Sequence, residues 1–293
     1  MDQTARLAEY PFMPRSFGID GHHMAYLDEG GGGMPVVMVH GNPSWSYLYR
    51  NLVFGLRDRH RCIVPDHLGC GFSDKPQAYP YCLATHIGNL ERLLDHLGIA
   101  RCALIVHDWG GAIGMGWAGR HPERVAGVVA LNTAAFRSHR MPLRIGICRW
   151  PLLGPLLVRG LNGFARAATV MAVNRPMRPE IARSFLAPYD SWRNRVGLLR
   201  FVQDIPMRPD HPSWPALVAV EQGLDRLRDC PLLLCWGGGD FCFNDHFYDE
   251  WRRRFPKAQA HHFPDAGHYV LEDALDRVQP LVASFLRRLG EER

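Results

Sequence analysis

The sequence lacks the features that mark exported, membrane-spanning and disulfide-stabilised proteins. Its first residues, MDQTARLAEYPFMPRSF, mix acidic and basic residues and contain no apolar stretch like that of a signal peptide. No later run reaches the roughly 18 apolar residues that a transmembrane helix requires. The eight cysteines form no CxxC pair and lie mostly in apolar stretches, as buried free thiols do. These absences predict a soluble, cytoplasmic protein.

Blocks of basic residues are also absent. The formal net charge is +5, but the arginines are spread along the chain and are not gathered with aromatics into a patch, so we expect no nucleic-acid partner. The 293 residues are 47% hydrophobic and 22% charged and contain no internal repeat. A chain of this kind can bury a large core in one domain, or in one domain with an inserted lid.

Short apolar runs alternate with helical segments along much of the chain. The runs are PVVMVHG (35–41), RCIVPD (61–66), CALIVHD (102–108), VAGVVALN (125–132) and CPLLLCWG (230–237). Continuous apolar runs of this length are typical of parallel strands buried on both faces. Between two of them, residues 84–98 carry apolar side chains three and four apart and end at Gly98, which predicts a helix. The alternation predicts an α/β fold with a mostly parallel sheet and helices on both faces.

The alternation of apolar runs and helical segments stops between about Phe136 and Trp214, where no comparable strand occurs. We therefore expect a helical cap at 137–214, inserted into a core formed by residues 1–136 and 215–293. Residues 149–173 are more apolar than a surface helix requires, yet arginines recur along them. They predict a lid over an apolar tunnel. A second interpretation adds an exposed face that contacts a partner enzyme or a bilayer surface.

Chemistry in an open α/β sheet lies at the carboxyl ends of the strands. Asp108 follows one strand, Asp240 follows a later one, and His268 lies in a loop before the final helix. The order nucleophile, acid, histidine is that of an α/β-hydrolase triad, in which the nucleophile sits on a sharp strand-to-helix turn. Asp108 then replaces the usual serine of this turn, and Val106 replaces its first glycine. The alternative is that Asp108 merely caps a helix.

An aspartate at this position changes the chemistry. A carboxylate is ionised at neutral pH and attacks carbon without a base, which leaves an ester or an anhydride on Asp108. His268, held in one tautomer by Asp240, would activate water or another proton transfer. Four other histidines have no such partners in the order of the chain, and we expect them in the core or on the surface: His40, His107, His261 and His262.

The segments HGNPSWSYLYRNL, DHLGCGFSDKP, HDWGGAIG and WGGGDFCF resemble the haloalkane dehalogenases of the α/β-hydrolase fold. The resemblance implies that Asp108 is the nucleophile and that Asn42 and Trp109 hold the leaving group, with their backbone N–H groups forming the oxyanion hole. One dehalogenase subgroup carries its acid at the position of Asn132, so here Asp240 is the acid. No cofactor and no metal are expected.

Other segments narrow the resemblance. YPFMPRSF (10–17), LNTAAF (131–136), APYDSWRNRVGLLRFVQDIP (187–206) and HYVLEDALDRV (268–278) are similar to the β-lactone decarboxylases of bacterial long-chain olefin formation. The resemblance implies a cis-β-lactone substrate with alkyl chains, cis-alkene and carbon dioxide as products, and an assembly with other olefin-pathway enzymes. Asp108 would open the ring at the alkyl carbon or at the carbonyl, and the sequence leaves both open.

Rival functions share much of this pattern. A haloalkane dehalogenase would use the same catalytic residues, and only the cap segment 187–206 and the small Ala134-Ala135 pair favour the lactone. Epoxide hydrolases use an Asp nucleophile with tyrosine donors on the cap, for which Tyr189 is the only evident candidate. A non-catalytic ligand-binding relative is disfavoured because Asp108, His268 and Asp240 are all present.

Overall fold

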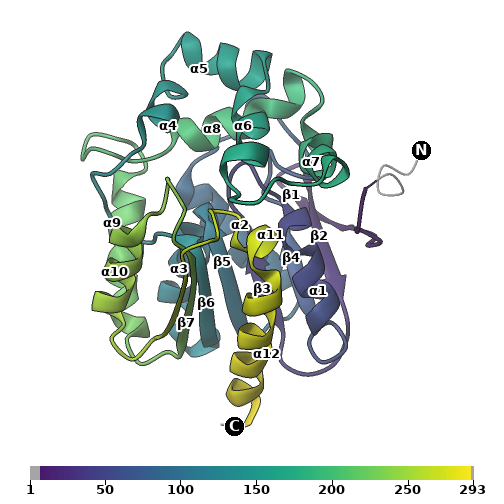
Figure 1. Ribbon diagram of the computed structural model, residues 1–293, viewed down its shortest axis with the longest axis vertical. Coiled ribbons are helices and arrows are strands. Elements are labelled where there is room, and N and C mark those ends of the chain that lie inside the picture. Colours follow the sequence, from purple (N-terminus) through teal and green to yellow (C-terminus); the bar gives the residue numbers. More distant parts are fainter. Residues whose placement is uncertain (1–6, 292–293) are drawn as a thin grey trace.

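The computed structural model describes residues 7–291 and is built around one mixed sheet of eight strands (Figure 1). The strand order is β1-β2-β4-β3-β5-β6-β7-β8. The first two strands pair antiparallel with their neighbours, and the other pairs are parallel. The strands are β1 (Arg15–Ile19), β2 (His22–Glu29), β3 (Val36–Val39), β4 (Cys62–Pro65), β5 (Cys102–Asp108), β6 (Val125–Thr133), β7 (Leu232–Gly237) and β8 (Gln259–Phe263).

Helices cover both faces of the sheet because the central strands are apolar on both sides. Helices α1, α11 and α12 pack on one face, and α2, α3, α9 and α10 pack on the other. Their bounds are α1 (Arg50–Leu56), α2 (Leu83–His96), α3 (Trp109–Arg120), α9 (Trp214–Gly223), α10 (Asp245–Arg254), α11 (Val270–Asp273) and α12 (Leu275–Glu291). Short 3-10 turns are η2 (Ser46–Tyr49), η3 (Pro122–Arg124) and η7 (Leu224–Leu227).

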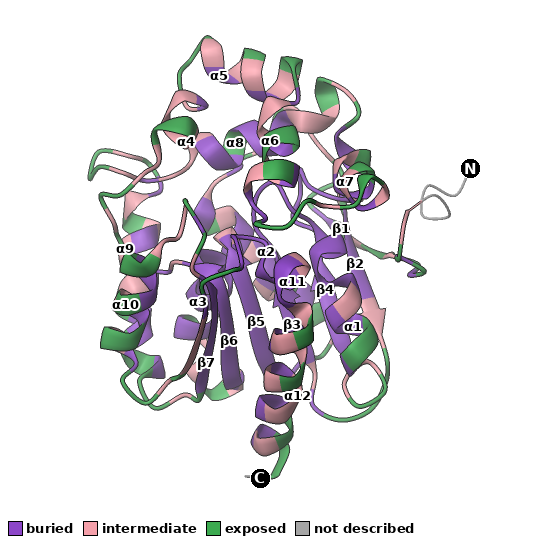
Figure 2. Cartoon of the chain, in the orientation of Figure 1, coloured by how far each residue is buried: buried purple, intermediate pink, exposed green. Residues whose placement is uncertain are grey.

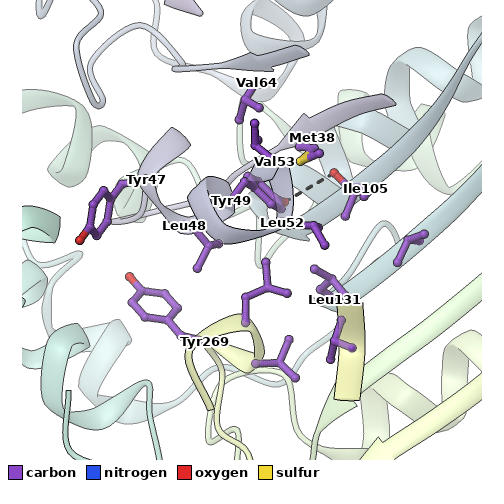
Figure 3. Close-up of a cluster of buried hydrophobic side chains, with 14 of the residues drawn as sticks. Met38, Tyr47, Leu48, Tyr49, Leu52, Val53, Val64, Ile105, Leu131 and Tyr269 are labelled. Atoms are coloured by element: carbon purple, nitrogen blue, oxygen red, sulfur yellow. Dashed lines mark hydrogen bonds between the residues drawn. The ribbon is translucent and has the colours of Figure 1, made fainter. Parts of the chain in front are cut away.

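One core cluster joins the sheet to α1 and the final helices (Figure 3). Tyr49 lies at its centre, fully buried, and its hydroxyl donates to the carbonyl of Val39 at 2.9 Å and more weakly to that of Ile105 at 3.5 Å. A buried hydroxyl needs such a partner. These bonds tie η2 to two neighbouring parallel strands, one of which ends at Asp108.

Residues 137–214, which we call the cap, lie over one end of the sheet (Figure 1). They contain helices and turns and no strand. The elements are α4 (Leu143–Ile147), α5 (Leu153–Pro155), the π-helical turn η4 (Leu156–Gly160), α6 (Gly163–Met171), α7 (Pro179–Leu186), η5 (Ala187–Tyr189), η6 (Arg193–Arg195) and α8 (Val196–Gln203). Helix α9 begins at Trp214, the last residue of the cap.

The α/β fold predicted from the sequence is confirmed, and each of the five predicted strands is present. The helix expected at 84–98 is α2, which ends two residues earlier, at His96. Strands β1, β2 and β8 were not predicted. β1 and β8 are the edge strands and β2 lies next to β1. All three carry exposed or half-exposed residues, so they lack the continuous apolar run that identifies a central strand.

The apolar segment 149–173 differs from the lid that its composition predicts. It is interrupted near Gly154 and again at Asn162, whose φ is +53°. Leu152 is 90% exposed, and Phe164 is the one residue of this segment that lines the main cavity described below. Apolar composition alone does not distinguish a side chain that faces a cavity from one that faces outward.

Two further observations concern the described residues only. No helix within 7–291 is long and apolar enough to span a bilayer. All eight cysteines lie in this range and all are free. The start of the N-terminal stretch, for which no export signal is expected, lies outside the described residues, as do residues 292–293 of the expected core.

Candidate active site

Asp108 occupies a strained turn between β5 and α3. Its φ is +53° and its ψ is −125°, a conformation that a residue with a Cβ rarely adopts. The register of β5 with β6 also shifts here, so that Asp108 pairs with Thr133 and skips Asn132. The Thr133 hydroxyl donates to the carbonyl oxygen of Asp108 and holds the turn. Strain of this kind is typical of a nucleophile elbow.

Glycines allow the backbone to approach this carboxylate closely. A Cβ on Gly41 would lie 2.0 Å from Asp108 Oδ1, and a Cβ on Gly110 would lie 1.9 Å from the carbonyl oxygen of Val39. Any side chain at these two positions would therefore displace the loop before Asn42 or the start of α3. The close approach lets the backbone N–H of Asn42 donate to Asp108 Oδ1 at 2.6 Å.

Asp108, His268 and Asp240 come together as the sequence order predicts. His268 Nδ1 lies 2.7 Å from Asp240 Oδ2, and His268 Nε2 lies 3.7 Å from Asp108 Oδ2. All three residues are less than one-tenth exposed. The first distance is a hydrogen bond that orients the imidazole; the second places the ring beside the carboxylate without a direct hydrogen bond.

Asn132 has a role at this site that the sequence analysis missed. Its Nδ2 donates to Asp240 Oδ2 at 3.0 Å and to the carbonyl of Gly237 at 2.9 Å, and its Oδ1 accepts from the Gly237 backbone N–H at 2.8 Å. The other oxygen of Asp240 accepts from the backbone N–H of Cys242 at 2.6 Å. Asn132, which occupies the position of the acid in one dehalogenase subgroup, therefore holds the acid of this site, Asp240, in place.

His107 contacts the ring of His268 and forms a hydrogen bond with its backbone. Its Nε2 donates to the His268 carbonyl at 2.9 Å, and the two rings are 4.4 Å apart. Burial strongly lowers the pKa of His107, as does the nearby charge of His268, so this side chain is neutral. His40 is also fully buried, as expected for core packing, and His262 Nε2 forms a hydrogen bond with Asp245 Oδ1 at 2.8 Å at the edge of the sheet.

The charges at the site are coupled. Burial raises the pKa of Asp108, against the lowering effects of His268 and of the backbone N–H groups of Asn42 and Trp109. For His268, burial lowers the pKa, but the two flanking carboxylates outweigh it, so the pKa is raised above its ordinary value. An ionised Asp108 and a protonated His268 therefore stabilise each other.

The expected leaving-group donors are both present beside Asp108. Asn42 Nδ2 donates to the carbonyl of Leu198 in the cap at 3.1 Å, and a second N–H on the same nitrogen remains available. The indole N–H of Trp109 donates to no other described residue, and Phe201 contacts its ring edge-on at 5.5 Å. Both side chains line the cavity above Asp108.

That cavity encloses about 880 Å³ of empty space, part of it open to solvent, and its walls are mostly apolar. From the core, the lining residues are Asn42, Leu83, Asp108, Trp109, Ala112, Ala134, Phe136, Leu217, Cys242, Phe243 and Phe247. From the cap they are Ser138, Arg140, Met141, Pro142, Ile145, Phe164, Val202, Ile205, Pro206 and Met207.

Three sequence expectations are refined by this cavity. Ala134 lines it, whereas Ala135 is buried in the core and does not. His268 reaches Asp108 from behind Phe243, whose ring stacks on it at 5.7 Å, and is absent from the lining. Tyr189 is fully buried, with its hydroxyl 3.4 Å from the carbonyl of Ser44, so it offers no donor to a ligand as an epoxide hydrolase would require.

No cluster of three or more potential metal ligands occurs in the described part of the chain.

The chain is similar to proteins of one known fold family. A family model for the alpha/beta hydrolase fold matches residues 34–275. A Shewanella oneidensis protein named cis-3-alkyl-4-alkyloxetan-2-one decarboxylase is 48% identical, over 94% of this chain and 89% of the relative. The haloalkane dehalogenase 2 of Mycobacterium bovis is 31% identical, over 96% of each chain. The crystal structure of the haloalkane dehalogenase DbeA from Bradyrhizobium elkani aligns with a TM-score of 0.87 at 24% identity, covering 96% of this chain and 100% of that one.

Proposed function

The chain belongs to the alpha/beta hydrolase fold family, in the group that includes the haloalkane dehalogenases, and on that premise we propose that it is a cis-β-lactone decarboxylase. The substrate is a cis-3-alkyl-4-alkyloxetan-2-one, and the products are a cis-alkene and carbon dioxide. One observation carries an enzymatic role: the Asp108 carboxylate lies on a strained elbow at the floor of a largely apolar cavity. The choice of lactone follows from the similarity to the Shewanella oneidensis decarboxylase.

In the first step, Asp108 attacks C4, the ring carbon that carries an alkyl chain and the ring oxygen. The new bond joins the aspartate oxygen to C4, and the bond between C4 and the ring oxygen breaks. The lactone carbonyl becomes a free carboxylate on C3. A four-membered ring is strained, and an ionised carboxylate can open it without a proton donor or a base.

In the second step, the electron pair of the bond between C3 and the carboxylate forms the C3=C4 double bond. Carbon dioxide leaves from C3, and the Asp108 carboxylate leaves from C4 with its electron pair. The first step inverts C4, so an anti elimination restores the cis geometry. Atoms and charge balance without water. Attack at the carbonyl would leave an oxygen on C4 that a further step must remove, and we therefore propose attack at C4.

The flanking groups have defined tasks in this scheme. Asn42 and Trp109 hold the lactone carboxylate where a dehalogenase holds its halide, because N–H donors stabilise an anion that develops in a largely apolar cavity. Against the lowering effect of burial, the two flanking carboxylates raise the pKa of His268, which favours its protonated form and balances the charge of Asp108. Asp240, fixed by Asn132, keeps the imidazole beside the nucleophile.

Haloalkane dehalogenation is the second candidate, because one relative with that name is 31% identical over nearly the whole chain. It would use Asp108, Asn42 and Trp109 in the same way but would end with hydrolysis of the Asp108 ester. Hydrolysis requires a neutral His268 to activate water. The two candidates therefore differ in whether His268 acts as a base.

A direct comparison of substrates tests the proposal. A dialkyl cis-β-lactone and 1-bromo- and 1-iodoalkanes are supplied to equal amounts of enzyme. Alkene is measured by gas chromatography, and halide release is measured in parallel. We expect alkene and carbon dioxide to form much faster than halide. Halide release without alkene would make the protein a dehalogenase. With ¹⁸O in the lactone ring, attack at C4 places all the label in carbon dioxide.

We further propose that the reaction takes place in the cytoplasm as a step of long-chain olefin formation, with hand-over of the lactone from other enzymes of that pathway. The eight free cysteines are compatible with a reducing compartment. The apolar cavity suits a substrate that has little solubility in water. Co-purification of the tagged protein with the lactone-forming enzyme of the same cell tests the hand-over.

A further inference from the structure

One end of the cap exposes large apolar side chains. In the segment 143–161, Leu152 is 90% exposed, Leu143 78%, Trp150 59%, Leu161 58% and Leu156 54%. We call this segment the cap face. It includes α4, α5 and η4, which lie at the end of the molecule farthest from the C-terminus (Figure 1). Figure 2 shows exposed and half-exposed residues along it. Single exposed leucines are ordinary, but five large apolar residues within 19 positions are not.

The same region carries unbalanced positive charge. No aspartate or glutamate occurs between Glu123 and Glu180, whereas residues 137–179 contain eight arginines. Three of them pair with carboxylates elsewhere: Arg137, Arg175 and Arg178. The other five have no carboxylate within 4.0 Å among the described residues: Arg140, Arg144, Arg149, Arg159 and Arg166. Elsewhere the exposed arginines are commonly paired, as Arg253 is with Glu250.

The mouth of the cavity adjoins this face. Arg140, which is exposed, and Ile145 line the cavity on either side of Leu143. The guanidinium of Arg144 lies 5.8 Å from the ring centroid of the half-exposed Phe241, next to the cavity residue Cys242. Arg140 and Ile145 therefore connect the wall of the cavity with the start of the cap face.

We propose that the cap face docks on an anionic lipid bilayer, so that the mouth of the cavity faces the membrane. Leucine and tryptophan side chains enter the headgroup region, while arginines contact lipid phosphates, a combination typical of interfacial anchors. The absence of acidic residues across the region complements a negatively charged surface. Docking goes beyond the proposed function. Only its consequence, that an alkyl-chain substrate enters from the lipid, rests on that function.

Vesicle sedimentation tests docking without any turnover. The purified protein is mixed at low salt with vesicles of phosphatidylglycerol and phosphatidylcholine, or with phosphatidylcholine alone. We expect sedimentation with the anionic vesicles, weaker sedimentation with the zwitterionic ones, and loss of binding as salt rises. Failure to sediment with anionic vesicles at low salt would overturn the proposal and would leave the proposed reaction untouched.

Two sets of variants localise the contact. Arg140→Gln with Arg144→Gln should weaken binding about thirtyfold, the equivalent of about 2 kcal/mol for two cationic side chains at an anionic surface. The matched control is Arg252→Gln with Arg287→Gln, which removes the same charge from exposed positions on α10 and α12 and should leave binding nearly unchanged. Leu143→Ser with Leu152→Ser should weaken binding about tenfold with no change in charge.

Other outcomes identify other occupants. Equal losses in the cap and control pairs would mean that total charge, not the cap face, drives binding, and the proposal would be wrong. Sedimentation velocity without lipid is the companion measurement. If the protein dimerises and Leu143→Ser with Leu152→Ser breaks the dimer, the face is an interface between copies.

Hydrogen exchange should show slower exchange at 143–156 only when anionic vesicles are present.

Discussion

The core and the cap contribute differently to the same cavity. The core supplies Asp108 and the polar network behind it, which buried hydrogen bonds hold in place, as Asp240 is held between His268, Asn132 and the Cys242 backbone. The cap supplies mostly apolar walls and one main-chain contact, the Leu198 carbonyl that accepts from Asn42. Its arginines largely lack carboxylate partners, whereas the buried Arg50 of the core forms a paired contact with Glu272.

We infer from this difference that the core determines the reaction and that the cap determines which substrates are accepted. A buried polar network tolerates little change, because a donor or acceptor left without its partner costs about 1–3 kcal/mol. An apolar wall can be reshaped at lower cost, since volume-conserving changes cost less than about 1.5 kcal/mol. We therefore expect substitutions in the core to abolish or redirect the chemistry, and substitutions in the cap to change which substrates are accepted.

Replacing the nucleophile should have the largest effect. Asp108→Ala should lower alkene formation by at least about 10,000-fold, as is typical when a covalent nucleophile is removed. The fold should remain, because removal of a buried carboxylate, whose charged form burial disfavours, offsets the lost hydrogen bonds. Gas chromatography measures the alkene, and circular dichroism with thermal unfolding is the control. A variant that retains a large share of the activity would rule out the covalent mechanism. Asp108→Asn is a weaker test, since deamidation can regenerate the carboxylate.

The next effect separates the two candidate reactions. His268→Ala should block ester hydrolysis, so haloalkanes should leave a stable alkyl adduct on Asp108 that intact-mass spectrometry detects. Decarboxylation needs no water, and we expect the same variant to retain slow alkene formation, reduced about 10- to 100-fold by loss of the cation beside Asp108. Adduct accumulation with the lactone as well would mean that His268 takes part in the release step.

The sequence predicted the core better than the cap for physical reasons. Central parallel strands are apolar on both faces, so β5 and β6 are visible as continuous runs, and the residues that follow them must meet at one edge of the sheet. From that geometry we predicted that Asp108, Asp240 and His268 lie close together. The edge strands β1 and β8 are partly exposed and leave no such pattern.

The supporting residues could not be identified in the same way. Asn132 has a φ of +36° at a register shift between β5 and β6, and a bulge of this kind has no periodic signature in one sequence. His107 was expected only to pack, because its bond to the His268 carbonyl joins residues 161 positions apart. The segment 149–173 was predicted from its composition to be a lid over an apolar tunnel, but composition does not specify the direction in which a side chain points.

The pH dependence provides a finer distinction between the reactions. Hydrolysis requires neutral His268, whose pKa is raised above its ordinary value near 6.5, so halide turnover should rise with pH through that higher value. Decarboxylation requires ionised Asp108, whose pKa burial raises and His268 lowers, and it is faster with a protonated His268 beside the carboxylate. Its rate should fall as pH falls through the Asp108 pKa and should decline again as pH rises through the His268 pKa. Single-turnover rates from pH 5 to 9 should therefore place the acid limb of decarboxylation below that of hydrolysis.

The smallest effect should come from the cap wall. Phe164→Ala removes an aromatic ring that is half-buried at the cavity and forms no hydrogen bond with the polar network around Asp240. A wider cavity should favour longer alkyl arms and hold shorter ones less firmly, changing the ratio of kcat/KM for long and short lactones by about tenfold, the scale of one or two methylene contacts.

The matched core variant is Phe247→Ala, which lines the same cavity but also packs against Phe136 and Phe243. That variant should lower the thermal unfolding temperature as well as activity, because it leaves a hole in the core. Competition between lactones of two chain lengths, read out as the ratio of the two alkenes, measures the preference without requiring absolute rates. If Phe164→Ala lowered both rates equally and left the ratio unchanged, the cap would support the reaction itself and the division between core and cap would not hold.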